Sequence, residues 1–158
     1  MRFIFFVGTI CVLFACDSQR VFEKNVEFKE RIWKISEPVG FDFQIEDTIN
    51  KYNVALNVRN SLNYPYARLF FNYELISPDK NLLSKNLVAE YLFDQKTGEP
   101  FGTSGLGDVY DHQFTVLKNY SFKKAGIYHF KAEQFMRLDS LPGVVAVGLR
   151  VELVRSKE

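Results

Sequence analysis

Apolar and polar residues alternate with a period near two through most of the chain after residue 40. The stretch FDFQI places Phe41, Phe43 and Ile45 on one face, with Asp42 and Gln44 on the other. The same alternation is present in YNVALNVR, LFFNYEL, LVAEYLF, IYHFKAEQF and VVAVGLRVELV. Short runs of this kind predict half-buried β-strands.

Turn-forming residues separate these runs. Pro78 suits the second position of a tight turn, which predicts a hairpin over residues 69–93. No segment has the periodicity of a three-turn helix, and the 16 Phe and 8 Tyr fit a pleated surface. We therefore predict an all-β fold, an antiparallel β-sandwich of the immunoglobulin-like or jelly-roll-like kind with about seven strands.

The first sixteen residues, MRFIFFVGTICVLFAC, have a different pattern. Arg2 precedes an apolar run that ends at Ala15, which is typical of a secretory signal peptide. As a helix this run would cover about 20 Å, whereas the hydrocarbon core of a bilayer is about 30 Å thick. We interpret the segment as an export signal and not as a membrane span.

The residues at its end resemble a bacterial lipobox, with Leu13 three positions before Cys16 and the small Ala15 directly before it. The Cys16 thiol is then expected to carry diacylglycerol, with further acyl chains such as palmitate, and to become the first residue of the mature chain. The alternative is an ordinary signal peptide with a chance cysteine. Because Cys11 leaves with the signal, the lipidated chain has neither a disulfide nor a free thiol.

The predicted organisation is a signal peptide over residues 1–15, a lipidated N-terminus and tether over 16–30, and a β-sandwich domain over 31–158. Within the second segment, residues 17 to about 30 are interpreted as a tether followed by an early strand. The net charge is only +1, without a basic cluster, which argues against a nucleic-acid partner. The acyl chains must therefore provide the attachment to membrane lipid. The residues after Cys16 lack an acidic run, which favours an envelope location facing the periplasm and leaves the choice of membrane open.

The glycine-rich stretch FGTSGLGDVYDHQF, residues 101–114, is the most unusual local composition. Asp108 follows the last glycine and would repel a phosphate, so a nucleotide loop is excluded. Asp108, Asp111 and His112 lack the spacing of calcium or zinc ligands, and we interpret them as solvated loop residues. We predict no catalytic residues, no metal and no cofactor.

The stretch NVRNSLNYPYARLFF, residues 57–71, is a candidate surface for binding a partner. Tyr64 and Tyr66 flank a proline and are accompanied by Arg59, Asn60 and Arg68, a combination suited to binding protein or sugar. The alternative is that the proline fixes a corner whose tyrosines cover the edge of the core.

Several motifs together resemble one family. They are the lipobox cysteine, VRNSLNYPYARLFF, FGTSGLGDVYD and QFMRLDSLPGVVAVGLRVE, in this order between Cys16 and about Glu152. The chain is similar to the gliding-motility lipoprotein H (GldH) family, although Phe101 stands where tryptophan is expected.

This resemblance implies a non-enzymatic, lipid-anchored envelope protein. It further implies a role in assembling or stabilising the gliding apparatus and the type IX secretion machinery, whose protein components would be its partners. Only the lipid-bearing role of Cys16 transfers residue to residue. The alternative function is a glycan-binding envelope lipoprotein, suggested by the β-rich fold and the tyrosines.

Overall fold

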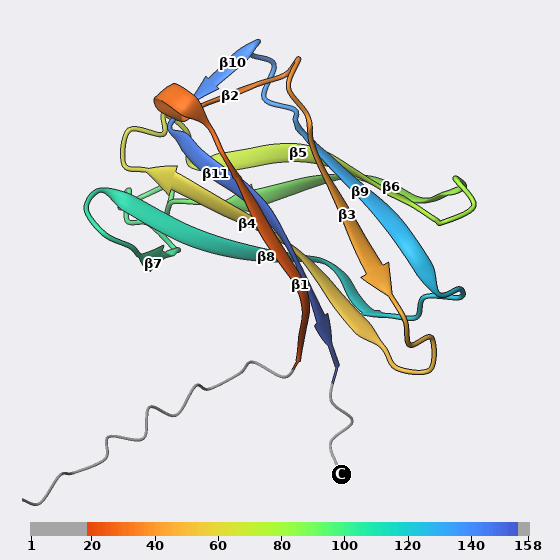
Figure 1. Cartoon of the computed structure of the whole chain (residues 1–158). Helices are drawn as coiled ribbons and strands as arrows, with labels where there is room; N and C mark the ends of the chain where they lie inside the picture. The colour runs from red at the N-terminus through yellow and green to blue at the C-terminus, as the bar shows by residue number, and fades with distance from the viewer. Residues whose placement is uncertain (1–18, 155–158) are drawn as a thin grey trace, which may run out of the picture.

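The computed structural model describes residues 19–154, which form two facing β-sheets (Figure 1). Within that range it has eleven strands, and its only helical piece is the short 3-10 turn η1 (Lys29–Arg31). The strands are β1 (Arg20–Glu27), β2 (Ile32–Lys34), β3 (Val39–Ile45), β4 (Tyr52–Ser61), β5 (Arg68–Ile76), β6 (Leu82–Tyr91), β7 (Thr103–Ser104), β8 (Val109–Tyr120), β9 (Gly126–Gln134), β10 (Ser140–Pro142) and β11 (Val144–Leu153).

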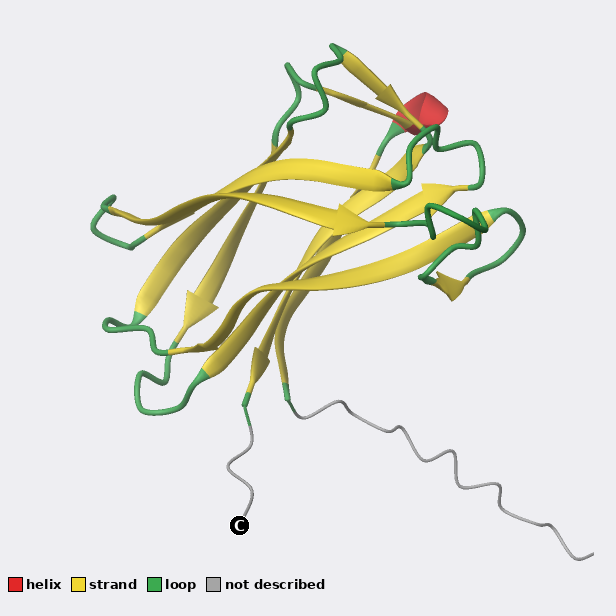
Figure 2. Cartoon of the chain, turned by 180° about the vertical axis from the view of Figure 1, so that it is seen from behind, coloured by secondary structure: helices red, strands yellow, loops and turns green. Residues whose placement is uncertain are grey.

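The first sheet has the strand order β1-β11-β4-β8-β7, and the second has the order β3-β9-β5-β6. Figure 2 shows the two layers from behind, with a small ribbon of β10 and β2 at one end. All pairings are antiparallel. The prediction of an antiparallel β-sandwich is confirmed.

The core lies between the sheets and follows the alternation in the sequence. In β5 the side chains of Leu69, Phe71, Tyr73 and Leu75 are buried, while the residues between them are partly exposed. Tyr73 stacks on Phe130 of β9 at 5.4 Å between ring centroids. The strand alternation therefore determines which residues fill the core.

The hairpin predicted over residues 69–93 is confirmed by the pairing of β5 with β6. Its turn is closed by the amide of Lys80, which donates to the carbonyl of Ser77 at 2.9 Å.

The sandwich begins earlier in the chain than residue 31, where the sequence analysis placed its start. Strand β1 pairs with β11 from Arg20 to Glu27, and Phe22 and Val26 pack against the core. Strand β1 therefore lies within the stretch that was predicted to hold a tether followed by an early strand. The predicted signal peptide and Cys16 lie outside the described residues. Over residues 19–154, the structure contains no helix with the length and apolar character needed to cross a membrane.

Candidate functional site

Tyr64 lies in the loop between β4 and β5 and is a core residue, with 4% of its surface exposed. Its hydroxyl donates to the carbonyl oxygen of Arg68 at 2.9 Å, and its ring stacks on Phe93 at 6.4 Å. Burial raises the pKa of the Tyr64 phenol, because the charged form would lose its hydration. The Tyr64 ring is thus not available as an exposed binding platform.

Gly143 allows the backbone before β11 to pack directly against Tyr64. A Cβ atom on Gly143 would lie 2.5 Å from the Tyr64 Cα, and the residue has φ of +82°. The Gly143 carbonyl accepts from the amide of Ser61 at 2.9 Å, and its amide donates to the carbonyl of Arg31 at 2.8 Å. A side chain at this position would break this close approach.

Met136 closes the other side of Tyr64. Its Sδ accepts from the amide of Phe70 at 3.2 Å and lies 3.9 Å from the Tyr64 hydroxyl. Arg137, which follows it, has φ of +58°. The segment after β9 is therefore held against the start of β5.

The glycine-rich segment before β8 joins the same region. The amide of Leu62 donates to the carbonyl of Asp108 at 2.9 Å, and Arg31 Nη1 lies 3.0 Å from Asp108 Oδ2. The amide of Phe101 bonds to Leu92, whose own amide bonds to Ala67, each at 2.9 Å. Hydrogen bonds thus connect the loop before β5 with the segment that follows β6.

Residues from three of the motifs that carry the family resemblance, all except the lipobox cysteine, therefore meet at one end of the sandwich. We call this region the Tyr64 corner and define it by Asn60, Tyr64, Asp108, Met136 and Gly143.

Exposed apolar side chains border the Tyr64 corner. Leu106 is 96% exposed, Tyr66 is 40% exposed, and Leu62 and Phe101 are exposed as well. Leu62 and Tyr66 lie between β4 and β5, whereas Phe101 precedes β7 and Leu106 follows it. The hydrogen bonds above connect these segments, and Tyr66 packs edge-on against Tyr64 at 5.9 Å. We call these four residues the apolar rim. Exposed apolar side chains gathered on one region are typical of protein interaction sites.

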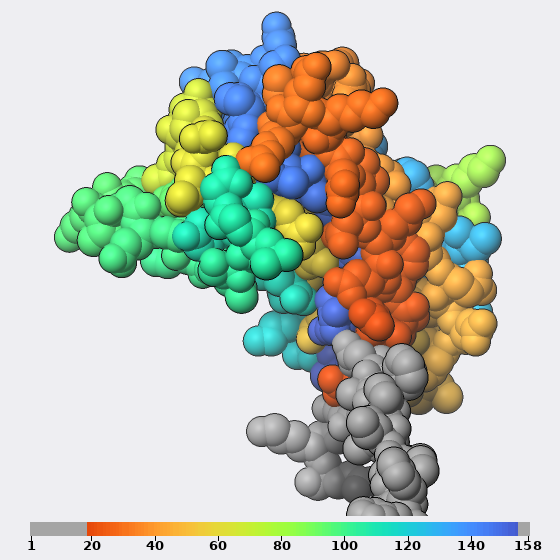
Figure 3. All heavy atoms as spheres, turned by 60° about the vertical axis from the view of Figure 1, so that its left-hand side comes forward, coloured from red at the N-terminus to blue at the C-terminus, as the bar shows by residue number. Residues whose placement is uncertain are grey.

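A polar groove of about 350 Å³ lies on the outer face of the first sheet and ends close to the corner. Figure 3 shows this face hollowed between β1 and β8. The small Ala146 contributes to its floor. Amide side chains line it, and they come from β1, β4 and β8: Asn25, Asn57 and Gln113.

Ion pairs hold the charged side chains of the groove in place. Arg59 binds Asp111 through two contacts of 2.7 and 3.1 Å, and this hydrogen bonding raises the pKa of Arg59. Both side chains are nearly half exposed, so the pair contributes at most about 1 kcal/mol to stability. Its main effect is to orient the two side chains.

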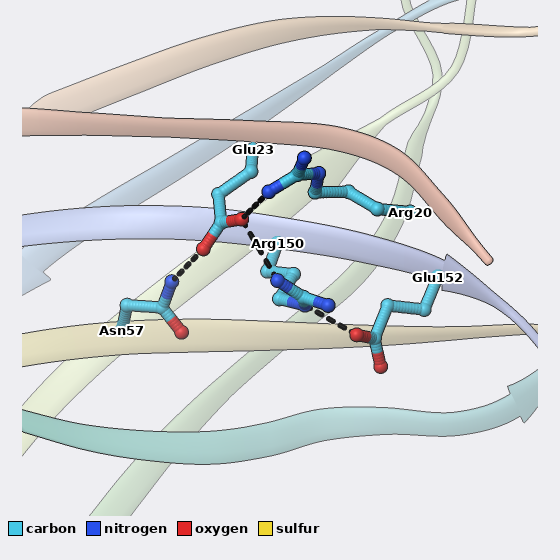
Figure 4. A network of polar contacts seen from close by, with 5 residues as sticks. All are labelled: Arg20, Glu23, Asn57, Arg150 and Glu152. Carbon is cyan, nitrogen blue, oxygen red and sulfur yellow. Dashed lines mark hydrogen bonds and ion pairs between the residues drawn. The ribbon is translucent and has the colours of Figure 1, made fainter. Parts of the chain in front are cut away.

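A second network lies along β1 and β11 (Figure 4). Glu23 accepts from Arg150 at 2.8 Å, from Arg20 at 3.0 Å and from Asn57 at 3.2 Å. Arg150 also pairs with Glu152. The Oδ1 atom of Asn57 is buried without a hydrogen-bond partner among residues 19–154. The groove is thus lined by the carboxylates of Glu23, Glu27 and Asp111 and by the guanidinium of Arg59.

Asp108, Asp111 and His112 were predicted to be solvated loop residues. Asp108 does lie in a loop with its side chain 44% exposed. Asp111 is solvated, with its side chain 45% exposed, but it is not in a loop, and for His112 the prediction is wrong. Asp111 and His112 both lie in β8, where they pair with Arg59 and Val58 of β4. His112 is only 7% exposed and stacks on Phe114 at 5.6 Å. Burial lowers the pKa of His112, with Asp111 acting in the opposite direction. These residues are in a strand because β8 pairs with β4, which is distant in the sequence, and the local composition does not reveal such pairing.

The five residues proposed from the sequence as a partner surface do not form one surface. Arg59 faces the groove, whereas Asn60 and Tyr64 are buried. Arg68 belongs to the second sheet, where its guanidinium lies 4.2 Å from the ring centre of Tyr91. Tyr66 is the member that lies in the apolar rim. The rim residues Leu62 and Leu106 were not singled out from the sequence, because nothing local distinguishes an exposed leucine from a buried one.

Within residues 19–154 no group of three or more His, Cys, Asp or Glu side chains is arranged to hold a metal ion.

The chain matches the family model described as GldH lipoprotein over residues 20–151. It is similar to the "Gliding motility lipoprotein GldH homolog" of Christiangramia forsetii, with 30% identity over 154 residues, 93% of this chain and 92% of that protein. It is also similar to the "Gliding motility lipoprotein GldH" of Flavobacterium johnsoniae, with 29% identity over 150 residues and 89% of each chain.

Among solved structures, the "Crystal structure of infectious bursal disease virus VP2 subviral particle" aligns with 83% of this chain and 30% of that chain. The TM-score of 0.36 and the 14% identity are too low to support any argument.

Proposed function

The chain belongs to the GldH lipoprotein family, and we propose that it helps to assemble or stabilise the gliding apparatus and the associated type IX secretion machinery. In this proposal the chain is a non-enzymatic envelope protein, acylated at Cys16 and facing the periplasm. Its partners are protein components of that machinery.

The observation that carries the proposal is the Tyr64 corner with its apolar rim. Packing and hydrogen bonds at the corner fix the β4–β5 and β6–β8 connections. The exposed rim residues Leu62, Tyr66, Phe101 and Leu106 are therefore held in place before any partner binds. Preorganised, exposed apolar and aromatic side chains favour protein–protein binding, because little conformational freedom is lost on association.

The proposal is tested by co-purification from cross-linked envelopes, with a tagged full-length chain and Cys16→Ala for comparison. We expect motility or secretion components with the acylated chain, and their loss in Phe101→Ser and Leu106→Ser. Ile127→Ser is the matched control for Phe101→Ser, since Ile127 is 59% exposed and Phe101 is 60% exposed, but Ile127 lies on β9, away from the rim.

Two results would contradict the proposal. One is unchanged recovery of partners in both rim variants at normal protein levels. The other is a deletion strain in which gliding and surface export are both intact.

The polar groove supports glycan binding as a second candidate function. Amide and carboxylate groups like those of Asn25, Asn57 and Asp111 are suited to sugar hydroxyls. The structure weakens the original reason for this candidate, since Tyr64 is buried and cannot stack on a sugar ring. A glycan array probed with the non-acylated chain and with Asn57→Ala tests it. Absence of any binding to the array would remove this candidate.

A further inference from the structure

The chain enters the sandwich next to the turn between β3 and β4, residues 46–51. The amide of Leu153 donates to the carbonyl of Gln19, and the amide of Val154 donates to the carbonyl of Lys51, each at 2.8 Å. Neighbouring strands lie about 4.8 Å apart, so Lys51, the last residue of the turn, lies about 10 Å from the first described residue.

The turn between β8 and β9, residues 121–125, lies at the same end. Tyr52 pairs with Tyr120, and Ile45 pairs with Gly126. Figure 2 shows the chain entry and these turns together at one end of the molecule.

The acylated residue of the proposed function is close to this end. Cys16 precedes Gln19 by three positions in the sequence, and an extended chain covers at most about 3.6 Å per residue. Cys16 can therefore be no more than about 11 Å from Gln19, because this short connection cannot reach farther.

The Tyr64 corner lies at the other end of β1. Strand β1 has 8 residues, which cover about 27 Å at the usual rise of a strand. Just beyond it, Arg31 binds Gly143 and Asp108 of the corner. When β1 stands upright on the membrane, the short connection to Cys16 keeps this end about 27 Å from the lipid; only a molecule lying with β1 along the surface brings both ends to it.

The end next to Cys16 has a surface suited to a bilayer interface. Ile49 is 92% exposed at the tip of the β3–β4 turn. The turn is well ordered, because Asp47 Oδ1 accepts from the amide of Ile49 at 2.7 Å and from that of Asn50 at 3.3 Å. Lys51 and Lys123 are exposed on the two turns at this end, as is Glu46, so charged side chains of both signs surround Ile49.

Resting on the proposed acylation of Cys16, we propose that this end of the sandwich lies on the membrane surface, with Ile49 at the level of the lipid headgroups. The acyl chains supply the affinity, and the turn sets the orientation. The Tyr64 corner and the apolar rim then point away from the lipid, where a protein partner can reach them.

Single-cysteine labelling tests this orientation. The chain has two cysteines, of which Cys11 lies in the predicted signal and Cys16 carries the lipid, so an introduced cysteine is the only free thiol. Ile49→Cys is labelled with an environment-sensitive fluorophore on the acylated chain in phosphatidylethanolamine–phosphatidylglycerol vesicles. Leu106→Cys is the matched control, since Leu106 is as exposed as Ile49 but lies in the rim.

We expect lipids with a quencher near the headgroup to remove most of the fluorescence at position 49 and almost none at position 106. Thr48→Cys, in the same turn, should be quenched like Ile49→Cys. This second position shows that the quenching at position 49 is not caused by the loss of the Ile49 side chain. Equal quenching at 49 and 106, or stronger quenching at 106, would overturn the proposed orientation.

Flotation of the same vesicles separates this result from a failure of the premise. If the Cys16→Ala chain floats with the vesicles as well as the acylated chain, acylation is not the anchor, and both the anchoring and the orientation are refuted. If only the acylated chain floats but position 49 is not quenched, the anchoring holds and the orientation alone is refuted.

Discussion

Replacing Gly143 with alanine tests the close approach on which the Tyr64 corner depends. The new Cβ would lie 2.5 Å from the Cα and 2.7 Å from the amide nitrogen of Tyr64, so one backbone segment must move. The left-handed φ of +82° costs an alanine roughly 1–2 kcal/mol. Overpacking a well-packed region costs roughly 1–3 kcal/mol more. We therefore expect Gly143→Ala to lower the free energy of unfolding by about 2–5 kcal/mol.

Gly98→Ala is the matched control. Gly98 also has a left-handed φ, +73°, but no heavy atom of the described structure lies within 4 Å of its Cβ position. This variant should lose only the conformational contribution, about 1–2 kcal/mol. The difference between the two variants then isolates the contact with Tyr64.

Urea unfolding of the mature chain with Cys16→Ser provides the measurement. Trp33 is the single tryptophan and is fully buried on β2, so its fluorescence reports unfolding close to the corner. A change in the midpoint at constant slope reports a change in stability. If Gly143→Ala loses no more stability than Gly98→Ala, the close approach to Tyr64 does not limit the stability of the fold, and our account of the corner is refuted.

Three further predictions concern the corner and the groove. Tyr64→Ala should lower the free energy of unfolding by about 3–5 kcal/mol because it leaves a cavity. Tyr66→Ala should lower it by less than about 1 kcal/mol and should instead reduce partner recovery from the cross-linked envelopes. Equal losses of stability would contradict the assignment of Tyr64 to the core and of Tyr66 to the rim. Burial lowers the pKa of His112, so the unfolded chain takes up a proton first as the pH falls below about 6.5. Stability is therefore full above that pH and declines below it until the lower folded pKa is reached, and His112→Phe should remove this part of the decline in unfolding curves at pH 7.5 and 5.5. Asp111→Asn should change stability by no more than about 1 kcal/mol, yet release Arg59; a larger loss in urea unfolding would show that the ion pair has a structural role.

The alternation of the sequence predicted the fold class because most strands bury one face. In β5 every second side chain is buried, so the period of two is visible in the sequence itself. Strand β1 is different. It is an edge strand, and only Phe22 and Val26 pack against the core, which leaves too few apolar positions for a clear period.

The candidate site was less predictable because its contacts are nonlocal. Tyr64 is buried by Met136, 72 positions later in the chain, and by the backbone at Gly143. His112 is inside the sandwich because β8 pairs with β4. Neither environment can be inferred from the composition around these residues, which is why Tyr64 resembled an exposed binding residue and His112 a solvated one.

The division between a buried corner and an exposed rim determines how loss of function must be interpreted. Tyr64, Met136 and Gly143 contact other parts of the same chain, so substitutions there act through the stability of the loops and thus through the amount of folded protein. Leu106 is 96% exposed, and Tyr66, although it packs against Tyr64, is 40% exposed, so both are open to a partner. Loss of gliding in a Tyr64 variant therefore shows only that the fold is needed, whereas loss of gliding in a Tyr66 or Leu106 variant at normal protein level would place a partner on the rim.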